Sequence, residues 1–147
     1  MRRIRLALSC LVAITALTAC SSNTERDKSV DDIAEAVRDL QSAMKDETAA
    51  VKTGEARDEV ENVQLVAQVE SSRLSKLSER APAETQDFAD AAEAWARAVA
   101  TSRTAILEQA DESTSTAAMM NVRLATKTMD SEAADLHVDP WLKLDQY

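Results

Sequence analysis

Apolar residues recur at spacings of three and four along four segments, and this periodicity constrains the fold more than any other sequence feature. Residues with such spacing lie along one side of a helix. The four stripes consist of Val30, Ile33, Val37, Leu40, Met44 and Val51; Val60, Val63, Ala67, Leu74, Leu77 and Ala81; Phe88, Ala92, Trp95, Val99 and Ile106; and Met119, Val122, Met129, Ala133 and Leu136. The sequence therefore predicts four amphipathic helices that bury these stripes against one another.

Residues typical of helix ends separate the stripes. Ser29 fits a helix N-cap, and the stretch 52–55 contains the single glycine of the chain. Pro82 is typical of a helix start, and the run 111–116 consists of turn and capping residues. We expect the fourth helix to end near Val138, just before a proline.

Four helices of similar length joined by short turns pack most simply as an up-down-up-down four-helix bundle, so the predicted fold class is all-α. One glycine, two prolines and 3% aromatic residues point away from a β-sandwich. The main alternative is a longer hairpin, continuous through Gly54, that completes its core by forming a homodimer.

The N-terminal segment has the layout of an export signal. Three arginines lie within the first five residues, and an apolar run covers 6–17. This run is too short to cross a bilayer, which takes roughly 20 apolar residues. At its end, Leu17-Thr18-Ala19-Cys20 resembles the lipobox of bacterial lipoproteins.

The resemblance implies that the Cys20 sulfur receives diacylglycerol and that a peptidase cleaves between Ala19 and Cys20. Acyl chains such as palmitate would then hold the exported protein at the cell membrane. Ser21 is not the aspartate that resembles an inner-membrane retention signal, so in a diderm the outer membrane is the expected destination. The alternative is an ordinary secretory signal that ends near a cysteine.

These features divide the chain into four parts. We expect a lipoprotein signal peptide over 1–19, a lipidated cysteine with a polar, flexible tether over 20–29, a four-helix bundle over 30–138, and a C-terminal tail over 139–147.

The charge balance excludes one class of partner. Cleavage removes three arginines and no acidic residue, so 17 basic residues become 14 against 26 acidic ones, and the net charge falls from −9 to −12. Nucleic-acid binding depends on clustered Lys and Arg, so nucleic acid is not an expected partner. Anionic head groups should repel the chain, and membrane attachment depends on the acyl chains.

No metal or cofactor site is expected. The ferritin-like di-iron pattern needs Glu-x-x-His on two helices, and the chain contains one histidine. A looser alternative places His137 near Asp87, Asp31 and Asp32, where it could bind a divalent metal or act as a pH-sensitive latch. We expect an exposed histidine at a helix C-terminus instead.

Two acidic residues and one tryptophan occupy unusual stripe positions. Glu47 and Glu70 stand where apolar residues are expected, so each should reach solvent or form an ion pair, with Arg38 a candidate partner for Glu70. Trp95 lies among alanines and fits core packing, with a slot for a small apolar ligand as the alternative. The four stripe and near-stripe methionines are expected to fill the core in the same way: Met44, Met119, Met120 and Met129.

The C-terminal tail contains aromatic and apolar residues beyond the last predicted helix. Trp141, Leu142 and Tyr147 follow the last predicted helix. We expect the tail to fold back and cap the bundle end, with a partner-binding peptide as the alternative.

The expected function is a non-enzymatic, membrane-anchored lipoprotein that binds another component of the cell envelope, such as an envelope protein. By analogy, one form of it is a prophage-encoded lipoprotein that excludes an incoming phage. The alternative is a carrier or sensor of a small apolar ligand in the bundle core. The mature chain has no thiol left, no second histidine, no Gly-rich phosphate loop and no Gly-x-Ser-x-Gly elbow, so no enzyme is predicted.

Overall fold

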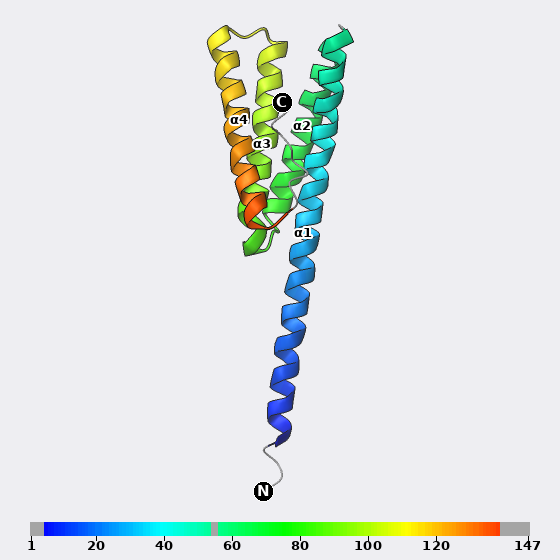
Figure 1. The fold of residues 1–147 in the computed structure, drawn as a ribbon, viewed down its shortest axis with the longest axis vertical. Helices are drawn as coiled ribbons and strands as arrows, with labels where there is room; N and C mark the ends of the chain where they lie inside the picture. The colour runs from blue at the N-terminus through cyan, green and yellow to red at the C-terminus, as the bar shows by residue number, and fades with distance from the viewer. Residues whose placement is uncertain (1–4, 54–55, 139–147) are drawn as a thin grey trace.

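A computed structural model describes residues 5–53 and 56–138, which form four α-helices and no β-strand (Figure 1). The helices are α1 (Arg5–Thr53), α2 (Ala56–Ser78), α3 (Ala83–Leu107) and α4 (Glu112–Asp135). The prediction of an all-α protein with four helices is confirmed. None of the helices, over the residues described, combines the length and the apolar content that a membrane crossing needs.

Helix α1 begins earlier than the sequence predicts. Its backbone is helical through 21–28, so the expected flexible tether is wrong for this stretch, and Ser29 is not an N-cap. The Ser29 hydroxyl instead shares a hydrogen bond of 3.1 Å with the Thr85 hydroxyl of α3. Arg26 donates to the backbone oxygen of Leu136 at 3.5 Å. These contacts with the bundle, and the lack of Gly or Pro in the stretch, favour propagation of the helix.

The predicted helix starts at Pro82 and Asp111 match the structure, whereas 112–116, predicted as a turn, belong to α4, which ends at Asp135 rather than near Val138. Pro82 is the N-cap of α3, with φ −56° and ψ 150°. Asp111 is the N-cap of α4 and accepts a hydrogen bond of 2.9 Å from the Thr114 backbone N–H. This bond lowers the pKa of Asp111, and the hydroxyls of Ser113 and Thr114 act in the same direction.

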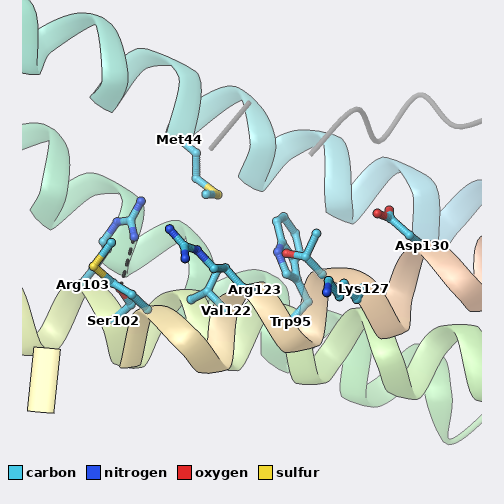
Figure 2. A pocket seen from close by; sticks show the side chains of 10 residues that line it. Met44, Trp95, Ser102, Arg103, Val122, Arg123, Lys127 and Asp130 are labelled. Carbon is cyan, nitrogen blue, oxygen red and sulfur yellow. Dashed lines mark hydrogen bonds between the residues drawn. The ribbon is translucent and has the colours of Figure 1, made fainter. Parts of the chain in front are cut away.

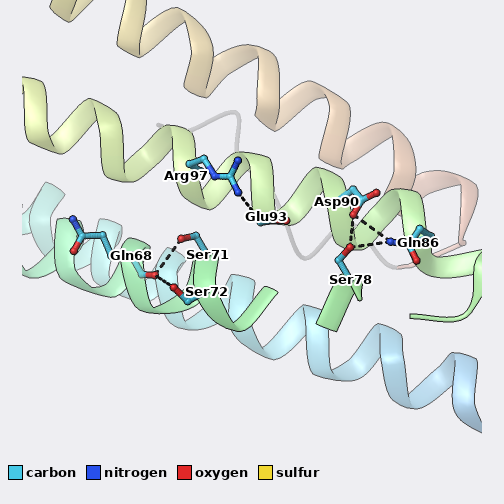
Figure 3. A network of polar contacts seen from close by, with 8 residues as sticks. All are labelled: Gln68, Ser71, Ser72, Ser78, Gln86, Asp90, Glu93 and Arg97. Atoms are coloured by element: carbon cyan, nitrogen blue, oxygen red, sulfur yellow. Dashed lines mark hydrogen bonds and ion pairs between the residues drawn. The ribbon is translucent and has the colours of Figure 1, made fainter. Parts of the chain in front are cut away.

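A polar cluster fixes the junction between α2 and α3 (Figure 3). The Ser78 hydroxyl at the end of α2 donates to the Asp90 carboxylate, and the Gln86 amide donates to the Ser78 oxygen at 2.8 Å. The same amide lies 3.3 Å from Asp90. Since Ser78 is buried, these bonds satisfy a hydroxyl that would otherwise destabilise the core.

The core forms mainly from the predicted stripes. Its largest fully buried side chains include Trp95, Phe88, Ile33, Leu40 and Leu74. Alanines of α3 let neighbouring helices approach closely; the fully buried ones are Ala89, Ala92 and Ala96. Helix α3 buries ten residues, whereas α4 buries three, so α3 is the central helix of the described bundle.

At one end of the bundle, residues of the predicted stripes are exposed instead of buried. Val51, Ile106 and Met119 belong to predicted stripes, yet they are 59%, 47% and 53% exposed. All three lie near the end where α1 stops and α4 begins, and Figure 1 shows α3 and α4 leaning away from α1 and α2 toward this end. Periodicity places these side chains on the inner faces of their helices, but no opposing helix is close enough to cover them.

Helix α4 packs on one neighbour. Extensive contacts join α1 to α2, α2 to α3, and α3 to α4, with a smaller set between α1 and α3. Contacts of comparable extent between α1 and α4 are absent over the described residues. Among the described residues, no helix covers the side of the bundle between α1 and α4.

Glu70 is a buried carboxylate with incomplete compensation. It is 7% exposed, and its Oε2 atom has no hydrogen-bond partner among the described groups. The ion-pair partner is Arg73, at 3.6 Å, whereas the sequence pattern suggests Arg38. Arg73 also pairs with Glu35 and Asp39 of α1. Burial raises the pKa of Glu70, and the Arg73 charge offsets only part of this effect.

Substitution of Glu70 by glutamine should raise the melting temperature at pH 7 by a few degrees. The pKa of Glu70 is higher in the folded state than in the unfolded state. Glu70 therefore does not lower the free energy of unfolding at a pH below the unfolded pKa. The destabilisation grows as the pH rises through the folded pKa. The advantage of Glu70→Gln over the wild type should therefore shrink as the pH falls from 7 to about 4. Circular dichroism melting curves across this range measure it.

Glu79→Gln is the matched control, because Glu79 is exposed at the end of the same helix region. It should change the melting temperature little at either pH. A lower melting temperature of Glu70→Gln at pH 7 would contradict the prediction and show that the pair with Arg73 outweighs the cost of burial.

Candidate functional site

A cleft of about 530 Å³ opens between α1, α3 and α4, on the side that α4 leaves uncovered (Figure 2). Helix α1 contributes Met44, and the other lining residues come from α3 and α4. The α3 and α4 residues are Trp95, Ser102, Arg103, Met119, Val122, Arg123, Thr126, Lys127 and Asp130. Its volume lies within the range of roughly 300–1,000 Å³ that is typical of small-molecule pockets.

Trp95 forms the floor of this cleft. It comes from the apolar stripe of α3 and is fully buried, so it also belongs to the core. Its indole Nε1 is one of two buried side-chain polar atoms without a hydrogen-bond partner over the described residues. An indole N–H usually finds a partner when it is buried, because an unpaired donor costs about 1–3 kcal/mol. Trp95 thus lines the cleft and contains a buried donor that has no partner among the described residues.

One end of the cleft is held by an ion pair between α1 and α3. The guanidinium group of Arg103 donates two hydrogen bonds to Glu47 Oε2, at 2.9 Å from Nε and 2.8 Å from Nη2. Both side chains are largely buried, at 15% and 9% exposure. The stripe position of Glu47 is thus explained by an ion pair, as the sequence suggests. Arg103 also lies 3.4 Å from the Ser102 hydroxyl.

The α4 wall of the cleft is basic. Arg123 and Lys127 lie four residues apart, so they project from the same side of the helix. No ion pair joins either of them to a carboxylate in the part of the chain that the structure describes. Figure 2 shows Arg103, Arg123 and Lys127 following one another along the cleft, with Met44 across from them. Lining the same cleft, Asp130 supplies the acidic group.

The structure places the other predicted site residues as follows. His137 is exposed, with a left-handed φ of 57° that ends α4. The described residues contain no group of three or more potential metal ligands. Cys20 and Ala19 lie in the helical backbone of α1, and their side chains are outside the described part. Trp141, Leu142 and Tyr147 lie outside the described residues.

The sequence prediction of a slot names Trp95 and misses the basic wall. The sequence does contain a pattern that points to this wall. Arg123 directly follows the stripe residue Val122, and Lys127 lies four residues after Arg123, on the same side of the helix. This pattern alone does not identify a binding site, since charged residues beside a stripe are usually solvated. The structure shows that these residues line a cleft, because α4 does not pack closely on α1.

Comparisons with known proteins found no match: no family model fits the chain, and no curated protein or solved structure is similar to it.

The Glu47–Arg103 pair generates a stability prediction. Arg103→Met should lower the free energy of unfolding by about 3 kcal/mol, because it leaves the buried Glu47 carboxylate without its partner. The double variant Glu47→Leu with Arg103→Met should recover most of this loss, since apolar residues of similar size can replace a buried pair. Urea unfolding of the two variants measures the difference.

Arg97→Met serves as the control, because it breaks the pair with Glu93 in which Arg97 is 70% exposed. Its cost should stay below about 1 kcal/mol. Equal losses for Arg103→Met and Arg97→Met would show that the α1–α3 pair has no special role.

Proposed function

We propose that this protein is a lipid-anchored, non-enzymatic binding protein that carries or senses a small apolar ligand in the cleft between α1, α3 and α4. The observation that carries the proposal is Trp95, which lines the cleft and whose buried indole N–H has no partner in the described structure. A ligand with an acceptor would satisfy this donor and cover the apolar floor.

The composition of the cleft supports binding rather than catalysis. Its lining combines apolar side chains with a few polar groups, as ligand pockets generally do. Histidine, cysteine and glutamate are absent from this described lining, and the Ser102 hydroxyl has Arg103 as its neighbour rather than a general base. Within the proposal, the helices form an up-down-up-down bundle whose fourth helix stands off from the first.

The proposed anchor puts this cleft at a defined distance from the membrane. If Cys20 is lipidated, Met44 lies 24 residues further along α1, about 36 Å at the rise of an α-helix. The helix would hold the cleft above the head groups while the acyl chains keep the protein attached. A ligand that partitions into membranes would then be within reach of the protein.

A second candidate function, binding to an envelope protein, is favoured by a shallow groove on α2. Leu65 and Val69 lie four residues apart in this groove, and both are more than half exposed. Exposed apolar pairs of this kind occur at protein interfaces. Replacing both with glutamine should abolish cross-linking to such a partner, and unchanged cross-linking would remove this candidate.

Ligand binding predicts a change at Trp95. In a Trp141→Phe chain, Trp95 is the single tryptophan, so its fluorescence reports on the cleft alone. Medium-chain lipids should quench or shift this emission in a saturable way, and native mass spectrometry should show a one-to-one complex.

Leu65→Gln in the same background is the control, because it alters an apolar side chain outside the cleft. It should leave the fluorescence titration unchanged. A protein that purifies empty and shows no saturable response of Trp95 to any lipid would contradict the proposed function.

The anchor is tested separately. Cys20→Ser should remove the protein from washed membranes without loss of helical content, because the serine oxygen does not accept the diacylglycerol that the lipobox thiol would receive. Cys10→Ser is the matched control: Cys10 lies in the apolar run of the signal, and its substitution should preserve attachment. Membrane fractionation and circular dichroism measure both variants. Retention of Cys20→Ser on washed membranes would contradict a lipid anchor at this residue.

A further inference from the structure

We infer that the ligand of this cleft is an anionic amphiphile, a medium-chain carboxylic acid whose carboxylate binds at Arg123, Lys127 and the Trp95 indole N–H. The inference rests on the proposed function and adds the chemical class of the ligand. It follows from the charge of the cleft, its apolar wall and the unpaired donor.

The charge of the cleft is opposite to that of the chain. The full sequence carries a net charge of −9, yet the cleft lining contains three basic residues and one acidic residue. Arg103 is compensated by Glu47 through two short hydrogen bonds. Arg123 and Lys127 have no such ion pair among the described carboxylates. With Arg103 compensated, Arg123 and Lys127 stand against the single carboxylate of Asp130, so the cleft keeps a surplus of one positive charge, which comes from α4.

The spacing of these two residues favours an anion between them. Like charges at i and i+4 on a helix repel one another and destabilise it slightly. A carboxylate placed between them converts this repulsion into two charge-assisted interactions, and its two oxygens offer enough lone pairs for more than one donor. In the view of Figure 2, Trp95 lies between Arg123 and Lys127 along the cleft.

The rest of the lining suits an acyl chain. Met44, Met119 and Val122 are apolar, and the flexible thioether side chains of methionine adapt to irregular ligands. From Met119 to Asp130 the α4 wall extends for about 16 Å at 1.5 Å per residue. Val122 adjoins Arg123, and Met119 lies about one turn before it, so an apolar surface lies beside the basic pair of α4. A molecule with an acyl chain and one charged group fits this lining.

The other candidate occupant of the cleft is the segment 139–147 of the chain itself. It contains Trp141, Leu142 and Leu144 together with two aspartates. We favour the free amphiphile because a single carboxylate satisfies both the basic pair and the buried indole donor.

The experiment compares dodecanoate with dodecanol, which differ in the charged end. Both are titrated below their aggregation limits into the full-length Trp141→Phe protein, and Trp95 fluorescence gives each Kd. Dodecanoate should bind at least about tenfold more tightly than dodecanol, because a hydrogen-bonded charge pair adds affinity that the neutral alcohol does not gain. Arg123→Gln with Lys127→Gln should raise the dodecanoate Kd to the value for dodecanol.

Arg57→Gln with Arg80→Gln is the matched control, since it makes the same change in net charge at exposed positions outside the cleft. It should leave the preference for dodecanoate unchanged. Arg123→Lys retains the charge and should retain most of the preference, which separates a charge effect from a loss of structure. Circular dichroism checks that every variant is helical.

The outcomes separate this inference from the proposed function. Equal binding of dodecanoate and dodecanol, insensitive to the Arg123/Lys127 substitutions, would overturn the anionic class and leave an apolar ligand in place. Binding of neither probe would overturn both. Binding that occurs only after Trp141, Leu142 and Leu144 are all replaced by alanine would assign the cleft to the tail and overturn the inference for the intact protein.

Discussion

The attachment of α4 to α3, without a comparable contact to α1, is the constraint on which the rest of the structure depends. Helix α4 buries Ala118, Met129 and Ala133, two of which are small, so its apolar surface is enough for one neighbour. Helix α3 contacts both sides of the bundle and buries the largest side chains. The cleft, the exposure of Met119 and the position of Trp95 in the cleft lining all follow from this arrangement.

Electrostatics favours the open arrangement as well. Arg103 of α3 and Arg123 and Lys127 of α4 line the same cleft, and closer packing of α4 toward α1 would bring like charges together in a poorly solvated space. Glu47 compensates the first of these charges by tying α1 to α3. An anionic ligand would compensate the remaining two. Arg123 and Lys127 are therefore the residues that an anion would contact.

The helices and most of the core could be predicted from the sequence, because local signals specify them. Pro82 and Asp111 mark helix starts through their own backbone and capping chemistry, and the stripes of α1, α2 and α3 repeat often enough to identify buried faces. Trp95 could be named as a core residue and as a slot residue from its alanine-rich surroundings, and its position at the floor of a cleft required the structure.

Features that depend on the spacing between helices could not be predicted in this way. Val51, Ile106 and Met119 have the right periodicity but lack an opposing helix. Ser29 has the chemistry of an N-cap, yet a hydrogen bond to Thr85 keeps it within a longer helix. The exposure of the stripe residues and the extension of α1 beyond Ser29 both depend on tertiary contacts, which override the local sequence preference for burial or for a helix cap.

In the proposed complex, the unpaired Trp95 indole N–H donates a hydrogen bond to the ligand carboxylate. In ¹⁵N-labelled Trp141→Phe protein, one indole N–H signal remains, and it belongs to Trp95. Two-dimensional ¹H–¹⁵N NMR during a dodecanoate titration follows this signal directly. Formation of the hydrogen bond should shift the proton signal downfield and slow its exchange with solvent. A signal that stays unmoved while dodecanoate saturates the protein would contradict it.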